Sequence, residues 1–234
     1  MRINPYTGAE LAHFEPTDTR SQVACLKERQ ASWRCVPIEE RCQYLLNALE
    51  YFEHHCDAIA SDISQEMGRP LAQARGEIDG LLERGRYLAS IAVETLSPDD
   101  VENKEGFDRA IVHEPLGVVF IISAWNYPLL ITINGVMASL LAGNVVLLKH
   151  ATQTLSIGAH FAKAFGDLVE HAVIDHAAAA ELMEIRAVDH VIFTGSVEAG
   201  RTVYQHAAKG LLDCQLELGG KDGAYVATDA NVAQ

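Results

Sequence analysis

The chain has 234 residues, 49% of them apolar and 21% charged, which is enough apolar material to bury a core. A formal net charge of −14, with no local cluster of Lys and Arg to offset it, predicts no nucleic-acid partner and no membrane partner. The first residues lack the apolar stretch of a signal peptide, and five cysteines without CxxC spacing are typical of a reduced, cytoplasmic chain.

The first 95 residues predict a helical region. Asn-Pro and Thr-Gly pairs within residues 3–11 predict a turn beside a short strand. Apolar residues then recur at helical spacing in three stretches, at 19–34, 37–59 and 70–94. The polar segment 96–114 follows and predicts a hairpin that cannot bury itself, because a two-stranded hairpin alone is only marginally stable.

From residue 115 onward, strands and helices are expected to alternate. Most of the strands are continuous β-branched or apolar runs, as expected for strands buried on both faces. The expected strands are 117–124, 144–149, 171–175, 190–194, 214–218 and 223–227. The expected helices are 128–142, 154–168, 177–186 and 197–209. This alternation predicts an α/β fold in which helices cover both faces of a parallel sheet.

The segment 117–149 carries no charge before Lys149, and it is long enough to suggest a membrane span. Two interruptions argue against a span: the sequence WNYP breaks the run near its start, and Gly143-Asn144 breaks it near its end. We therefore interpret the segment as a buried strand, a buried helix and a second buried strand.

The stretch FTGSVEAG, residues 193–200, is typical of a strand that turns into a helix. The turn at Gly195 and Ser196 would aim free backbone N–H groups and the positive end of the helix at an incoming anion, which favours a phosphate. Gly200 lies one turn into the helix, where a side chain would hold the helix away from its strand. The spacing is not the G-x-G-x-x-G fingerprint, so a plain capped turn stays open as the alternative.

Two polar residues follow buried strands at the edge where open α/β sheets bind ligands. The amide of Asn126 can stabilise negative charge that develops on a carbonyl oxygen, or it can cap the helix that follows. Lys149 can hydrogen-bond a ribose hydroxyl or a phosphate, or it can reach solvent. The residues by themselves leave both alternatives open.

Glu217 stands in the apolar strand CQLEL, directly before Gly219-Gly220. A carboxylate there can act as a general base if its pKa is raised, or it can pair with a cation at the strand edge. Cys214 lies three positions earlier. Because side chains alternate along a strand, Cys214 and Glu217 should point to opposite faces, and Cys214 is interpreted as a small core residue.

The cluster His54-His55-Cys56 contains groups that bind zinc. Adjacent helix positions splay apart, and no second group stands at ligand spacing. We therefore expect no metal site.

Four motifs, in this order along the chain, are more specific together than any of them alone: PLGVVFIISAWNYP, AGNVVLLK, FTGSVEAG and LELGGK. With INPYTGAEL and EMGRPLAQARGEI, they closely resemble the aldehyde dehydrogenase superfamily over residues 3–234. The resemblance implies a Rossmann-like cofactor domain, NAD or NADP as the cofactor, a small-molecule aldehyde as the substrate, and a homo-oligomer. In that family a cysteine attacks the aldehyde, hydride leaves to nicotinamide, and water hydrolyses the resulting thioester.

The resemblance also implies roles for individual residues. Asn126 matches the asparagine that helps to hold the oxyanion, and Glu217 matches the general base. Lys149 matches the lysine that contacts the adenosine ribose, and Gly195 with Ser196 matches the turn at the pyrophosphate. Further cofactor-site positions are Ala124, Trp125, Gly200, Leu218 and Gly219.

The sequence departs from the family in three places. Thr152 stands where many members have a ribose-binding acid, and the loss of that carboxylate favours tolerance of a 2′-phosphate, hence NAD or NADP. The link from Lys149 to Gly195 lacks the usual Pro-Gly approach, which implies an altered adenine side. Only 17 residues follow Glu217, and the family nucleophile lies beyond them in a separate domain.

These observations predict the domain plan and the function together. Residues 1–95 are the N-terminal helical part of the cofactor domain, 96–114 are an oligomerisation-type hairpin, and 115–234 are the NAD(P)-binding core. We expect a fragment of an aldehyde dehydrogenase that lacks the nucleophilic cysteine and is inactive alone. The alternative is a non-catalytic dinucleotide-binding or regulatory module.

Overall fold

The computed structural model describes residues 2–102 and 104–231. Its central feature is a five-stranded parallel sheet with the strand order β5-β4-β3-β6-β7. The strands are β3 (Val118–Ile122), β4 (Val145–Lys149), β5 (Val169–His171), β6 (His190–Gly195) and β7 (Asp213–Leu218). The order reverses after β5, because the chain runs outward from β3 through β4 to β5 and then returns to the other side of β3.

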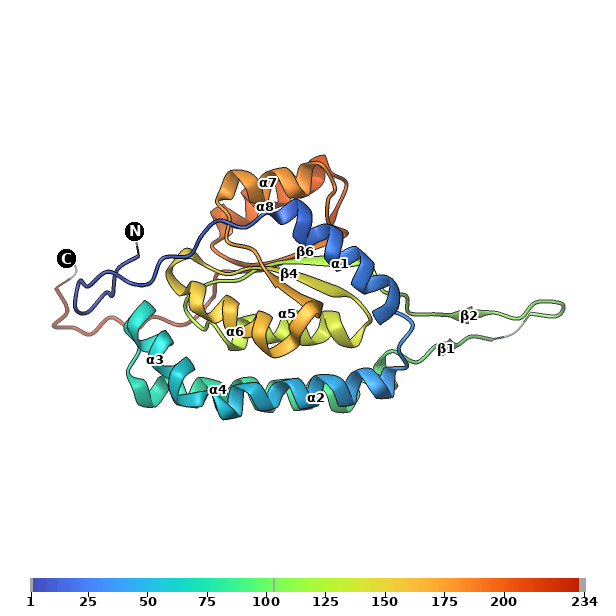
Figure 1. Ribbon diagram of the computed structural model, residues 1–234, viewed down its shortest axis with the longest axis horizontal. Coiled ribbons are helices and arrows are strands. Elements are labelled where there is room, and N and C mark those ends of the chain that lie inside the picture. Colours follow the sequence, from blue (N-terminus) through green and yellow to red (C-terminus); the bar gives the residue numbers. More distant parts are fainter. Residues whose placement is uncertain (1, 103, 232–234) are drawn as a thin grey trace.

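Helices lie in layers on both faces of this sheet, as the sequence predicts (Figure 1). One face is covered by α1 (Thr19–Trp33), α7 (His176–Glu184) and α8 (Val197–Lys209). The other is covered by α5 (Leu130–Leu141) and α6 (Leu155–Phe165). Outside these two lie α2 (Ile38–His54), α3 (Cys56–Met67) and α4 (Leu71–Thr95). Two short 3-10 helices, η1 (Thr152–Thr154) and η2 (Gly166–Leu168), flank α6.

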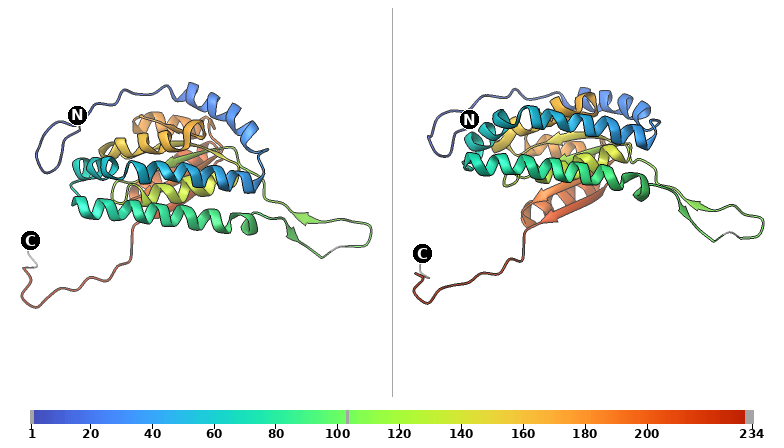
Figure 2. Two further views of the ribbon diagram at one scale, coloured as in Figure 1. Left: turned by 60° about the horizontal axis from the view of Figure 1, so that its bottom comes forward. Right: turned by 90° about the horizontal axis from the view of Figure 1, so that it is seen from below.

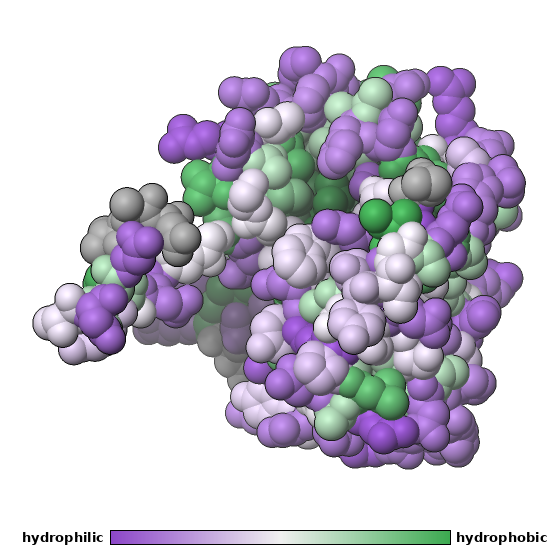
Figure 3. Space-filling view, turned by 90° about the vertical axis from the view of Figure 1, so that its left-hand side faces the viewer, coloured by the Kyte–Doolittle hydropathy of each residue, from purple (hydrophilic) through white to green (hydrophobic). Residues whose placement is uncertain are grey.

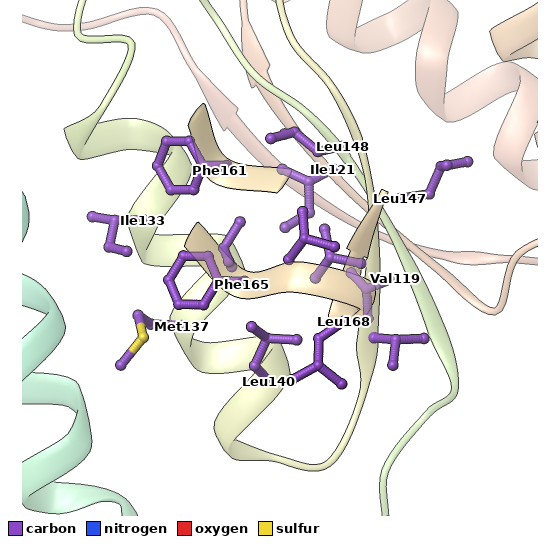
Figure 4. Close-up of a cluster of buried hydrophobic side chains, with 14 of the residues drawn as sticks. Val119, Ile121, Ile133, Met137, Leu140, Leu147, Leu148, Phe161, Phe165 and Leu168 are labelled. Atoms are coloured by element: carbon purple, nitrogen blue, oxygen red, sulfur yellow. The ribbon is translucent and has the colours of Figure 1, made fainter. Parts of the chain in front are cut away.

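The apolar core fills the space between the sheet and the two inner helices α5 and α6 (Figure 4). Every residue of β4 is buried, as are the first four residues of β3, which explains why both strands read as continuous apolar runs. Phe161 and Phe165 of α6 are fully buried, and Phe161 contacts Phe52 of α2 with ring centroids 5.2 Å apart. Truncating such a phenylalanine to alanine costs about 3–5 kcal/mol. The outer helix α2 is therefore packed onto α6, which in turn covers the sheet.

The second predicted helix is two helices. Residues 37–59 have one apolar periodicity, yet α2 ends at His54 and α3 begins at Cys56. His55 between them has φ −109° and ψ 17°, and its Nδ1 donates to the carbonyl of Tyr51 at 2.8 Å. The imidazole thus competes with the helix ladder for that carbonyl, which accounts for the break.

Two of the predicted strands differ in the structure. The expected strand 171–175 lies earlier, at Val169–His171, because Asp175 already caps α7 by accepting a hydrogen bond from the Ala178 N–H at 2.8 Å. The expected strand 223–227 is wrong: the segment is extended and exposed, with Tyr225 92% accessible. A strand needs a partner for its backbone groups, and no described strand lies beside this segment.

The hairpin prediction for 96–114 is confirmed. β1 (Asp99–Asp100) pairs antiparallel with β2 (Ala110–Ile111), and the hairpin projects from the body on the side away from the termini (Figures 1 and 2). The interpretation of 117–149 as strand, helix and strand also holds, since β3, α5 and β4 occupy it. Among the described residues, no helix is long and apolar enough to cross a membrane.

Candidate active site

The carboxyl ends of β3, β6 and β7 meet in a cleft of about 560 Å³. Because the strands are parallel neighbours, the turns that follow them share one edge of the sheet. The cleft is lined by Ala124, Trp125, Asn126, Thr194, Gly195, Ser196, Glu217, Leu218, Gly219, Gly220 and Asp222. Most of the residues singled out from the sequence are therefore brought together here. Figure 3 faces the side on which both termini lie in Figure 1; apolar (green) side chains are visible there in a recess surrounded by polar (purple) ones.

Glu217 reaches the cleft from the edge strand β7. Its position is opposite Thr194 of β6, and its side chain is exposed. Within the described part of the chain the carboxylate has no hydrogen-bond or ion-pair partner, so the alternative of a strand-edge ion pair finds no support. The carboxylate is therefore open to contact a molecule bound in the cleft.

Cys214 lies on the other face of β7, as predicted. The strand alternates between half-buried residues, which include Cys214 and Leu218, and exposed residues, which include Glu217. Cys214 packs against the core, and burial raises the pKa of its thiol to about 11. It is a core residue and is not a nucleophile for the cleft.

The β6–α8 turn has the predicted form. The Ser196 hydroxyl caps α8 by accepting a hydrogen bond from the Ala199 N–H at 3.2 Å. A Cβ atom on Gly200 would lie 2.5 Å from a terminal methyl carbon of Leu218, so glycine lets α8 lie directly on β7. The Gly219 N–H donates to the Gly195 carbonyl at 3.4 Å, which ties the end of β7 to this turn.

A second cavity, of about 380 Å³, lies at the same edge between the sheet, α7 and α8. Lys149 lines it from the end of β4, and Ser196 lines both this cavity and the cleft, so the two meet at the β6–α8 turn. Lys149 is 5% accessible. Burial lowers the pKa of its ammonium group, and the Asp175 carboxylate opposes that shift. A buried cation beside a helix N-terminus suits a polar, anionic ligand.

The structure places two of the predicted residues outside both cavities. Thr152 is exposed on η1, and Gly200 is buried on the side of α8 that faces β7; neither lines a cavity wall. Thr152 follows His150, which is buried and whose ring nitrogens contact the hydroxyls of Thr132 and Thr154 at 3.2 and 2.9 Å. Burial lowers the pKa of His150 to about 4. Through these two contacts His150 helps to hold the turn between β4 and α6 in place.

Sequence reasoning missed two charged residues that hold the Asn126 turn. Glu77 of α4 is buried and accepts hydrogen bonds from the Leu129 and Leu130 N–H groups at 2.8 and 3.2 Å. Arg69 pairs with Glu77 and donates to the Asn126 carbonyl. The available signal was a glutamate on the apolar side of a helix, where an unpaired charge would be costly.

Among residues 2–102 and 104–231, no group of three or more His, Cys, Asp or Glu side chains is arranged to hold a metal ion. His55 instead bonds Tyr51, and its ring stacks on the Tyr51 ring with centroids 4.1 Å apart.

The reversed strand order and the cavities at the carboxyl edge define a Rossmann-like α/β domain. Comparison with known proteins is more specific. The model of the aldehyde dehydrogenase family matches residues 1–234, and the chain belongs to that family.

Individual relatives agree. The chain is 33% identical to a succinate-semialdehyde dehydrogenase [NADP(+)] of Deinococcus radiodurans, over 97% of this chain and 49% of the relative. It is 31% identical to the Escherichia coli succinate semialdehyde dehydrogenase [NAD(P)+] Sad, over 99% of this chain and 52% of the relative. The crystal structure of succinic semialdehyde dehydrogenase from Streptococcus pyogenes with NADP+ superposes with a TM-score of 0.88 at 25% identity, over 94% of this chain and 50% of that one. The chain thus spans about half the length of these relatives.

Proposed function

We propose that the chain is the cofactor-binding half of an aldehyde dehydrogenase that oxidises an aldehyde to a carboxylic acid with NAD or NADP. The observation that carries this proposal is the convergence of Asn126, Glu217 and the α8 N-terminus on one cleft. Relatives described as NADP- or NAD(P)-dependent support the choice of cofactor.

The residues fit a dinucleotide laid along the carboxyl edge. The phosphates would lie at the turn of Gly195 and Ser196, where the N-terminal N–H groups of α8 and its positive end favour an anion. Lys149 would hold the ribose end in the second cavity, and Ala124 with Leu218 would hold the nicotinamide end in the cleft. When bound, the cofactor supplies the hydride acceptor.

The chain's own groups would handle the carbonyl and the proton. The Asn126 side chain donates its N–H to the oxygen that becomes negative when the aldehyde is attacked. The Glu217 carboxylate takes a proton from the water that hydrolyses the acyl group. Neither group supplies a nucleophile.

None of the described cysteines lies in the cleft. Cys25 and Cys35 are exposed on α1 and after it, Cys42 and Cys56 are half-buried in the outer helices, and Cys214 faces the core. We therefore propose that this polypeptide alone does not oxidise aldehydes, and that turnover needs a cysteine-bearing half. This feature favours the second candidate function, a dinucleotide-binding module without catalysis.

Cofactor binding is tested by titrating the chain with NADPH and NADH while its two tryptophans, Trp33 and Trp125, are excited; of the two, Trp125 lines the cleft. Binding should quench tryptophan emission through energy transfer, and Lys149→Met should weaken the binding of both nucleotides. Because Thr152 replaces an acid, comparable affinities are expected. A strict preference for NADH would contradict this interpretation of Thr152.

The two candidate functions separate when the second half of a relative is supplied to this chain. Co-expression with the segment of the Deinococcus relative beyond the matched half should restore aldehyde-dependent NADPH formation if the chain is half of an enzyme. Glu217→Gln should then abolish turnover while nucleotide binding is kept. A soluble, nucleotide-binding complex without turnover would support the non-catalytic module.

A further inference from the structure

Residues 66–77, which join α3 to α4 and which we call the elbow, carry two buried carboxylates. Glu66 lies one residue before the end of α3 and Glu77 two turns into α4, and their side chains are 4% and 2% accessible. Between them the chain turns at Gly68, whose φ is +78°. Burying two carboxylates is costly unless each is fully partnered, so their partners indicate what the elbow does.

Glu77 partners the turn that carries Asn126. One carboxylate oxygen accepts the N–H groups of Leu129 and Leu130, and the other pairs with Arg69. Arg69 continues past this pair: it donates to the Asn126 carbonyl, and its guanidinium lies 4.4 Å from the centroid of the Tyr127 ring. The β3–α5 turn is thus held at both ends from the elbow, by Glu77 of α4 and by Arg69 just before that helix.

Glu66 partners the turn that carries Thr152 through one carboxylate oxygen, while its other oxygen, Oε2, is buried without a hydrogen-bond partner among the described residues. Its carboxylate accepts the Ser156 N–H at 3.2 Å and the Ser156 hydroxyl, and it pairs with Arg2. Arg2 also continues past the pair, donating to the Gln153 carbonyl at 3.3 Å and to the Ala12 carbonyl at 2.9 Å. The β4–α6 turn is therefore held from α3 and the N-terminal segment.

The repetition distinguishes these contacts from ordinary helix capping. A cap needs only the glutamate and the first N–H groups of the helix. In both cases an arginine extends from the glutamate to a backbone carbonyl in the turn itself, at Asn126 in one and at Gln153, next to Thr152, in the other. The arginines therefore hydrogen-bond backbone carbonyls of the two turns, and helix capping does not require these bonds.

We propose that the elbow positions the two turns that follow β3 and β4 at the sheet edge, with Arg69 as the positioning residue for the Asn126 turn and Arg2 as the positioning residue for the Thr152 turn. This inference rests on the proposed cofactor function. The elbow would thus keep the cleft rigid although none of its residues lines either cavity.

The test uses the full chain with Arg69→Met, Arg69→Lys and Arg2→Met, and Arg86→Met as the matched control. Arg86 is on α4, the helix that follows Arg69, and it also pairs with a glutamate, Glu53, but it contacts neither turn. The readouts are acrylamide quenching of Trp125, which is 47% accessible, the dissociation constants of NADPH and NADH, and the urea unfolding midpoint.

Loss of Arg69 should raise the acrylamide quenching constant of Trp125 and weaken both nucleotides by roughly tenfold, the size of loss typical when an outer-shell partner is removed. Loss of Arg2 should change the NADPH to NADH affinity ratio and leave Trp125 quenching at the wild-type value. Arg86→Met should change neither, even if it shifts the unfolding midpoint. Lysine at 69 keeps a charge for Glu77 but lacks the planar fork that reaches two acceptors, so it should fold and still raise the quenching constant.

The positioning role is overturned if Arg69→Lys and Arg69→Met leave both the Trp125 quenching and the nucleotide affinities unchanged. It is also overturned if Arg86→Met reproduces their effects, because the change would then reflect stability alone. If the wild-type chain binds neither nucleotide, the cofactor proposal fails instead. In that case the positioning role of the elbow is still tested by comparing Trp125 quenching in the Arg69 variants with that in Arg86→Met.

Discussion

Gly200→Ala tests whether close contact between α8 and β7 shapes the cleft. The new Cβ would lie 2.5 and 2.9 Å from the two terminal methyl carbons of Leu218, so the leucine side chain has to move by about an ångström to reach ordinary contact. Overpacking of this kind costs about 1–3 kcal/mol, while alanine gains about 1 kcal/mol over glycine in a helix interior. The expected net effect is a loss of stability between about 0 and 2 kcal/mol.

Gly76→Ala is the matched control. Gly76 is also inside a helix, α4, but a Cβ there meets nothing within 4 Å, so this variant should gain up to about 1 kcal/mol. Urea unfolding followed by circular dichroism should separate the two variants by roughly 1–3 kcal/mol. Because Leu218 lines the cleft, Gly200→Ala should also weaken NADPH binding. Equal stabilisation by the two alanines would refute the packing argument.

Three further predictions concern single side chains. Burial lowers the pKa of His150 from 6.5 to about 4. As the pH falls from 6.5 to 4, the unfolded chain therefore takes up a proton at this residue before the folded chain does, and the folded state loses stability. His150→Gln should remove roughly 3 kcal/mol of this pH dependence from the free energy of urea unfolding, and an unchanged slope would contradict a buried neutral imidazole. Burial raises the pKa of the Cys214 thiol to about 11, so this thiol should react with iodoacetamide at pH 8 roughly a hundredfold more slowly than an ordinary cysteine. Exposed Cys25 should be labelled early, and peptide mass mapping of timed samples measures both rates. Early labelling of Cys214 would show that it is not packed as described. Leu211 is exposed with φ +53°, so Leu211→Gly should gain up to about 1 kcal/mol in thermal or urea unfolding, and a loss would show that its side chain contributes packing.

The sheet and the convergence of the site were predictable because they depend on short stretches of sequence. β3 and β4 are buried on both faces, so each reads as an unbroken apolar run. Parallel strands bring the residues after them to one edge, which is why Asn126 and the turn at Ser196 could be assigned to the ligand-binding edge; Glu217 lines the same cleft.

What could not be predicted depends on partners far away in the chain. Arg69 lies 57 residues before the Asn126 carbonyl it contacts, and no local pattern reports that contact. The segment 223–227 has the composition of a strand but finds no neighbour among the described strands, and composition does not supply one. The exposed position of Thr152 is likewise decided by how η1 follows buried His150.

The open edge of β7 gives Glu217 a second consequence. On this strand the backbone groups facing away from β6 have no described strand partner, and such an edge can recruit the same strand of another molecule. Asp213 and Glu217 place negative charge along the exposed face of that edge, and two copies brought edge to edge would repel each other. The carboxylate proposed for catalysis would therefore also disfavour edge-to-edge pairing of two copies through β7. Neutral Glu217 variants need sedimentation measurements beside their kinetics, because lost turnover and a changed oligomeric state would otherwise look alike.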